Sequence, residues 1–115
     1  MRIALFISVF VLFFGCQKSG KDEPTNLVPE DKMVAVMVDM HLVETAHNMK
    51  LIGADSTYTE YLQTFNSIFE SHGVTKADFD SSLMYYTAST EKMPEMYDKV
   101  LEELYEMEAE VKSDQ

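Results

Sequence analysis

The sequence predicts an all-α protein, a small bundle of about four helices that follows a leader segment and a tether. Apolar residues recur at intervals of three and four in four separate segments, the period of helices with a buried side. The strict alternation of apolar and polar residues that marks a strand is absent. At 115 residues, the chain has room for one domain with a single small core.

Residues 1–15 are predicted to be a signal peptide. Arg2 supplies a positive charge before the short apolar run Ile3–Phe14. A membrane-spanning helix needs roughly 20 apolar residues, so this run fits the apolar region of a signal peptide better. Gly15 and Cys16 resemble the processing site of a bacterial lipoprotein, in which the cysteine receives lipid and becomes the N-terminus. The resemblance implies palmitate on Cys16 and a location in the cell envelope, on the periplasmic or surface face of the outer membrane.

Residues 16–28 are predicted to be the lipidated cysteine and a tether. Gln17–Leu27 is polar, contains Gly and Pro, and has no apolar period, so we expect it to be flexible. Gln17-Lys18 and Lys21-Asp22-Glu23 resemble the acidic, lysine-led signal that directs some Bacteroidetes-type lipoproteins to the outer face of the outer membrane. An ordinary solvated linker is the alternative.

The first predicted helix is the centre of the bundle, because Met33–Ile52 is apolar enough to be packed on more than one side. Pro29 suits the first helical position, and Gly53 predicts that the helix ends near Ile52. Small and polar residues form one narrow stripe along it: Lys32, Ala35, Asp39, Ala46 and Lys50.

The second predicted helix follows Thr57, which forms a capping box with Glu60. Its apolar residues repeat at three and four and form one largely aromatic side. These residues are Tyr58, Tyr61, Leu62, Phe65, Ile68 and Phe69.

The third predicted helix has the clearest start in the chain. Gly73 supplies the left-handed stop of the preceding helix. Thr75 is then the cap with Asp78 as its reciprocal partner, and Val74 and Phe79 form a hydrophobic staple. We expect the helix to bury Phe79, Leu83 and Tyr86 and to weaken around Ala88-Ser89-Thr90.

The fourth predicted helix extends the helical domain to residue 112, so that the domain covers residues 29–112 and residues 113–115 are a tail. Pro94 leaves its first residue open. Its apolar residues are Met93, Met96, Tyr97, Val100, Leu101, Leu104, Met107 and Val111. The acids on its outer side are Glu102, Glu103, Glu106, Glu108 and Glu110.

Groups of residues along this helical domain resemble a known family. They are Pro29-Glu30-Asp31-Lys32-Met33, Asp39-Met40-His41-Leu42-Val43-Glu44, His72-Gly73-Val74-Thr75, and Phe79 with Ser82-Leu83-Met84-Tyr85-Tyr86. Their order and spacing resemble the small Bacteroidetes-type lipoproteins that carry domain of unknown function family 4296. The resemblance implies an α-helical envelope protein and supplies no activity, cofactor or partner.

Composition narrows the classes of partner. With 20 acidic against 9 basic residues, the chain lacks the clustered cations that phosphate-backbone recognition needs, so we expect no nucleic-acid partner. The single cysteine excludes an intramolecular disulfide and a cysteine-based zinc site. We expect contact with the membrane through lipid on Cys16 and with an envelope protein.

Four polar residues lie within the apolar arc of the first helix: His41, Glu44, His47 and Asn48. Together with Asp39 of the narrow stripe, they predict a polar cleft. Glu44 and His47 have the spacing of carboxylate and imidazole ligands in helical di-iron proteins, but no second such pair exists. We therefore expect no metal and no other cofactor, with His41, Glu44 and His47 as the weaker metal hypothesis. The alternatives are contacts with tyrosine hydroxyls or water, and a groove for a peptide or small ligand.

No catalytic signature is present. The sequence lacks a Ser-His-Asp pattern and a phosphate-binding glycine-rich loop, so we expect no enzyme. The first hypothesis is a lipid-anchored helical interaction module of the envelope. The second is a small-ligand or metal carrier that uses His41, Glu44 and His47. Methionine-rich apolar surfaces adapt to varied partners, but most methionines here occupy core periods.

Overall fold

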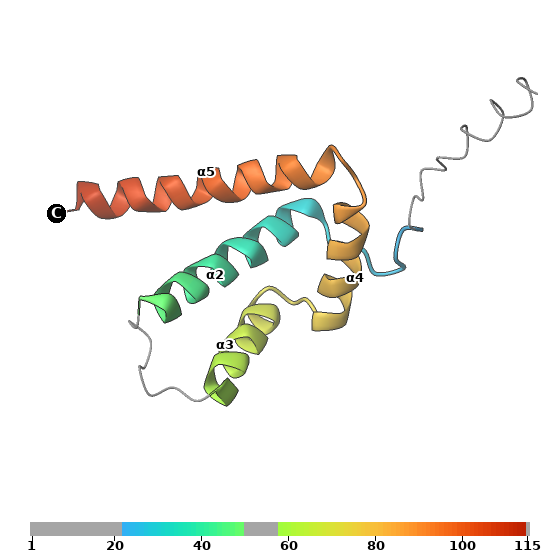
Figure 1. Cartoon of the computed structure of the whole chain (residues 1–115), viewed down its shortest axis with the longest axis horizontal. Coiled ribbons are helices and arrows are strands. Elements are labelled where there is room, and N and C mark those ends of the chain that lie inside the picture. The colour runs from blue at the N-terminus through green and yellow to red at the C-terminus, as the bar shows by residue number, and fades with distance from the viewer. Residues whose placement is uncertain (1–21, 50–57, 115) are drawn as a thin grey trace, which may run out of the picture.

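The computed structural model describes residues 22–49 and 58–114, and within them it contains four helices and no strand. The helices are α2 (Glu30–Asn48), α3 (Tyr58–Ser71), α4 (Lys76–Thr87) and α5 (Lys92–Ser113), shown in Figure 1. The prediction of an all-α bundle is therefore confirmed. Several predicted features lie outside the described residues: the signal peptide, Cys16, the first part of the tether, Lys50, the stop at Gly53 and the cap at Thr57.

Helix α2 lies between α3 and α5 and contacts both, as predicted for the central helix (Figure 1). The buried residues of α2 all lie in its first half: Met33, Val34, Val36, Met37 and Val38. The helix ends at Asn48, with Met49 as its C-cap, earlier than the predicted end near Ile52. The last residues of α2 are mostly exposed, and since packing supplies most of the stability of a helix in a protein, little favours a longer one.

One end of the bundle is closed around Val28, the residue just before α2. The Val28 N–H donates to Ser82 Oγ at 2.9 Å, and the Tyr86 hydroxyl donates to the Val28 carbonyl oxygen at 2.8 Å, both in buried surroundings. Met33 and Met96, which belong to the same buried core cluster as Val28 and Tyr86, are 0% exposed. We call these five residues the closed end. Burial raises the pKa of the Tyr86 phenol, and the negative charge of the nearby Glu30 raises it further.

Val28 follows directly on the segment Gln17–Leu27 that is expected to be flexible. Its side chain is buried and both of its backbone polar groups are hydrogen-bonded. A buried backbone donor or acceptor needs a partner, and α4 supplies one for each. The chain is therefore fixed before the first residue of α2.

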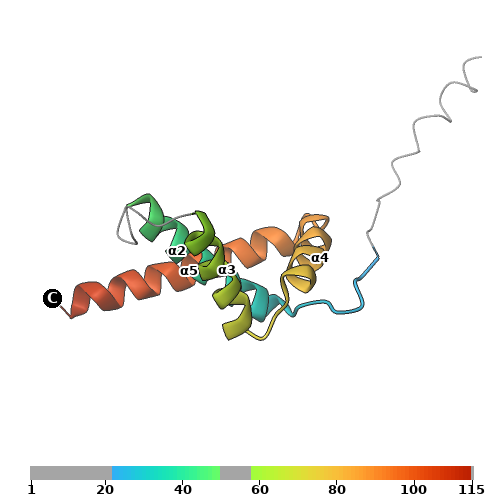
Figure 2. The same ribbon diagram turned by 90° about the horizontal axis from the view of Figure 1, so that it is seen from below.

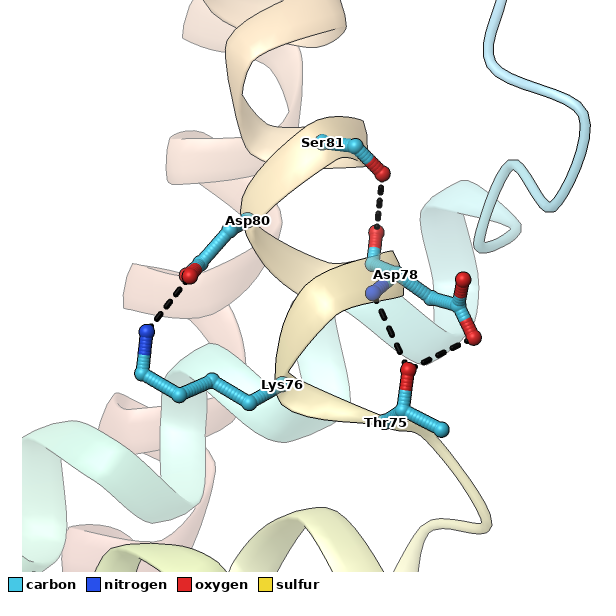
Figure 3. A network of polar contacts seen from close by, with 5 residues as sticks. All are labelled: Thr75, Lys76, Asp78, Asp80 and Ser81. Carbon is cyan, nitrogen blue, oxygen red and sulfur yellow. Dashed lines mark hydrogen bonds and ion pairs between the residues drawn. The ribbon is translucent and has the colours of Figure 1, made fainter.

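The turn between α3 and α4 has the predicted chemistry. Gly73 adopts a positive φ of 62°, where L side chains are disfavoured. The Asp78 N–H donates to Thr75 Oγ1 at 3.1 Å, and the Thr75 hydroxyl donates to Asp78 Oδ2 at 2.7 Å (Figure 3). Val74 and Phe79, the predicted staple, both belong to the buried core. The start of α4 is confirmed.

Helix α5 begins at Lys92, two residues before Pro94. The Lys92 N–H donates to Ser89 Oγ at 3.1 Å, while Pro94 falls in the first turn, where a backbone N–H has no partner within the helix. Lys92 Nζ also lies 3.4 Å from Glu30 Oε1, so the first turns of α2 and α5 are held together.

Away from this end, α2 and α5 diverge (Figures 1 and 2). Val100 is 0% exposed and Leu104 still packs partly against the core. The apolar period of α5 then continues on exposed residues, which we call the open side of α5: Leu101 (47% exposed), Tyr105 (67%), Met107 (40%) and Val111 (61%). Within residues 22–49 and 58–114, none of the helices has the length and apolarity that crossing a membrane requires.

Candidate functional site

The structure divides the predicted polar cleft between two sides of α2. Asp39 and His47 contact residues of α3 and the turn that follows it, whereas His41 contacts α5. Glu44 lines a small cavity on the same side as His41, and Asn48 is exposed one turn further on. The five residues therefore do not converge on one point.

The side toward α3 is a set of contacts between helices. His72 Nε2 lies 2.7 Å from Asp39 Oδ2, a hydrogen bond between an imidazole N–H and a carboxylate. The rings of His47 and Tyr61 have centroids 4.7 Å apart, and Tyr61 packs in turn on Phe65 at 4.8 Å. These contacts hold α3 against α2, so Asp39 and His47 serve the fold in this structure.

His72 is a partner that sequence reasoning missed. It lies 33 residues from Asp39 along the chain, and no local pattern connects the two. The available signal was an acidic residue on the central helix and a histidine next to Gly73, which ends α3. Pairing them requires knowing that α3 returns along α2.

The side toward α5 contains a cavity of about 140 Å³ between α2, α4 and α5. It is lined by Met37, Met40, His41, Glu44, Phe79, Leu83 and Tyr97. His41 Nδ1 lies 3.0 Å from the Met37 carbonyl oxygen and donates to it, and the His41 ring meets Tyr97 nearly edge-on at 6.4 Å between centroids. The cavity therefore has apolar walls, with the exposed Glu44 carboxylate as its acidic group.

The size of this cavity limits what it can hold. Pockets for drug-sized ligands and cofactors occupy about 300–1,000 Å³. A cavity of about 140 Å³ corresponds to roughly five water molecules at about 30 Å³ each. It fits one long side chain better than a cofactor.

The fold does not bring the candidate metal ligands His41 and His47 together. His41 and His47 contact different neighbours, Tyr97 of α5 and Tyr61 of α3. In the part of the chain that the structure describes, no three His, Cys, Asp or Glu side chains are grouped so that they could hold a metal ion.

One surface feature of α5 was not predicted as a site. A hollow of about 450 Å³ runs along α5 and is lined by Asp98, Leu101, Glu102, Tyr105, Glu106 and Ala109. All of its lining comes from one helix, so it is an open surface rather than an enclosed pocket. The sequence shows the apolar period of α5, but only the fold shows that its second half is left uncovered.

Comparison with known proteins identifies one family. A family model described as Domain of unknown function (DUF4296) matches residues 24–110, a range that includes α2, α3, α4 and most of α5. No curated protein and no solved structure matches the chain.

Proposed function

The chain belongs to the DUF4296 family, to which no function is assigned, and from the features of its fold we propose that it is a lipid-anchored, non-catalytic helical module that binds a protein partner in the cell envelope. The observation that carries this proposal is the open side of α5. The leader sequence and Cys16 support the lipid anchor.

The exposed apolar residues of the open side are grouped on one broad arc of α5, which also includes the exposed Glu108–Lys112 ion pair. Leu101, Tyr105, Met107 and Val111 lie within three turns of one helix and are all exposed. Isolated exposed apolar residues are normal, but grouped ones bordered by polar residues mark interaction sites. A helix with one apolar side commonly docks through that side.

The lipid anchor would place this surface near the membrane without inserting it. Several acyl chains, at about 0.8 kcal/mol per buried CH₂, hold a protein on a bilayer for long times. The net charge of −11 opposes adhesion of the domain itself to anionic lipid. The segment between Cys16 and the buried Val28 sets how far the domain can stand from the bilayer.

Metabolic labelling with palmitate tests the anchor. We expect label on the wild-type chain and none on the Cys16→Ser variant, because the thiol is the acceptor. Equal labelling of both chains would remove the lipoprotein assignment.

Site-specific crosslinking in intact envelopes tests the interaction module. A photoreactive amino acid replaces Met107 on the open side or, as a matched control, Met84 of α4, which is 54% exposed and lies away from it. We expect a reproducible protein adduct from position 107 and none from position 84. No adduct at position 107, or the same adducts at both positions, would contradict the proposal.

The carrier hypothesis has less support. Its three residues, His41, Glu44 and His47, are divided between two sides of α2, and the cavity beside His41 and Glu44 is small for a ligand. We therefore retain the interaction module as the proposed function.

A further inference from the structure

Acidic residues border the open side of α5 on both flanks. Between Lys92 and Ser113 the helix carries seven acids and three bases, and Lys92 and Lys112 are already paired with Glu30 and Glu108. Asp98 and Glu102 line the hollow beside Leu101 and Tyr105. On the other flank, Glu103 and Glu110 lie four residues before and three after Met107, which makes them its neighbours on the helix surface.

This charge pattern selects among the occupants that could cover the open side. A second copy of the chain would bring acidic flanks against acidic flanks, and like charges face to face oppose association. An anionic lipid surface is disfavoured for the same reason. A helix with an apolar side and lysine or arginine on its flanks would instead bury the apolar residues and place its cations opposite the acids.

The cavity between α2, α4 and α5 lies one turn of α5 before the open side. Tyr97 lines the cavity and precedes Leu101 of the open side by four residues, one turn of α5. Its walls of Met37, Met40 and Leu83 suit the methylene stem of a long side chain. At the same site, Glu44 offers a carboxylate and Tyr97 an aromatic ring to a cationic head group.

We propose that the partner segment is a cationic amphipathic helix that lies along the open side of α5 and inserts one lysine or arginine side chain into the cavity beside Glu44. This inference rests on the proposed function and names the partner class for the same surface. The apolar contacts exclude water, and the inserted side chain fixes the position of the partner helix along α5.

Binding of a designed probe tests the inference. The probe is a fluorescently labelled, helical peptide of leucine and lysine with one apolar side, and the protein is the full chain held in nanodiscs of zwitterionic lipid. Fluorescence anisotropy should show saturable binding that weakens with added salt, because the flanking charges are screened. Met107→Ser and Glu44→Gln should each raise Kd about tenfold, as expected for residues at an anchor point.

Matched controls separate this site from general attraction between opposite charges. Met84→Ser and Glu70→Gln remove an exposed methionine and an exposed acid elsewhere on the surface and should leave Kd within about twofold. The same peptide with glutamate in place of lysine, and empty nanodiscs, should show no binding. Circular dichroism checks that each variant keeps its helices.

Five results would overturn the inference. Equal binding to all variants would show nonspecific attraction, and unchanged binding by Glu44→Gln would remove the inserted side chain. Sedimentation showing a dimer that Met107→Ser dissociates would identify a second copy as the occupant. A photoreactive group at position 107 that labels only lipid would identify the bilayer. A protein adduct at position 107 without peptide binding would reject the cationic helix and leave the proposed function standing. Absence of both the adduct and peptide binding would reject the proposed function together with this inference.

Discussion

Met96 of the closed end and Met107 and Val111 of the open side belong to one hydrophobic period of α5, yet they differ in what covers them. At the closed end Met96 is 0% exposed beside Met33, and the backbone of Val28 is bonded to Ser82 and Tyr86. Three turns later, Met107 and Val111 keep the same spacing and remain exposed. A hydrophobic period therefore predicts a helix, but it does not show which of the apolar residues the chain itself buries.

The sharpest contrast is between two methionines of α5. Met96→Ala should lower the free energy of unfolding by about 2–5 kcal/mol, because it leaves a cavity in a fully buried site. Met107→Ala should change it by no more than about 0.5 kcal/mol, because its side chain is already in contact with water. Urea unfolding of both variants measures the difference. A small effect at both positions would mean that the closed end is not the stable core.

A hydrogen bond at the closed end gives the next largest effect. Tyr86→Phe leaves the buried Val28 carbonyl without its partner, which should cost about 1–3 kcal/mol of unfolding free energy. Chemical denaturation at neutral pH measures this loss. A change below about 0.5 kcal/mol would show that water replaces the hydroxyl and that the end is not closed.

The buried phenol of Tyr86 predicts that the stability of the fold depends on pH. Its raised pKa means that the folded chain favours the neutral phenol, so this stabilisation is fully present below the unfolded pKa of about 10 and is lost as the pH rises through the raised folded value. Melting temperatures above pH 9 should therefore fall more steeply for the wild type than for Tyr86→Phe. Parallel curves would contradict the burial of the phenol.

Loss of the cap of α4 should change the free energy of unfolding by less than Met96→Ala and by more than Met107→Ala. Thr75→Ala removes the acceptor of the Asp78 N–H and should cost about 1 kcal/mol, whereas Thr75→Ser should keep most of the stability. Thermal unfolding compares the two variants. If serine is as damaging as alanine, the methyl group of Thr75 rather than its hydroxyl matters.

No effect is expected from metal ions. Zinc or iron should leave the melting temperature unchanged, because His41 and His47 contact different helices. Differential scanning calorimetry with and without each metal tests this. A clear rise with metal that disappears in His47→Ala would restore the carrier hypothesis and place a ligand site on α2.

Local sequence patterns predicted those features of the fold that depend on contacts between residues close together in the chain. The spacing of apolar residues predicted the helices, and Gly73, Thr75 and Asp78 predicted the start of α4, because these contacts span only a few residues. Ser82 and Tyr86 bind Val28 across 54 and 58 residues, and no local pattern indicates that contact. Ser82 in particular is a polar residue that is fully buried because a backbone N–H before α2 needs an acceptor.

The candidate site shows the same limit. The sequence placed His41, Glu44 and His47 together on α2, but it did not show that His41 contacts α5 and His47 contacts α3. The divergence of α2 and α5 (Figure 1) is a property of the whole fold that no local pattern indicates.

Hydrogen exchange along α5 tests most directly whether the first half of this helix is packed in the core while the second half is uncovered in the chain alone. In the chain alone, amides around Met96 and Val100 should exchange slowest, and those from Met107 to Val111 should exchange much faster, because packing protects only the first group. The second group should become protected when the cationic helical peptide is added. Uniform slow exchange along the whole of α5 in the chain alone would contradict the account, because the open side would already be covered.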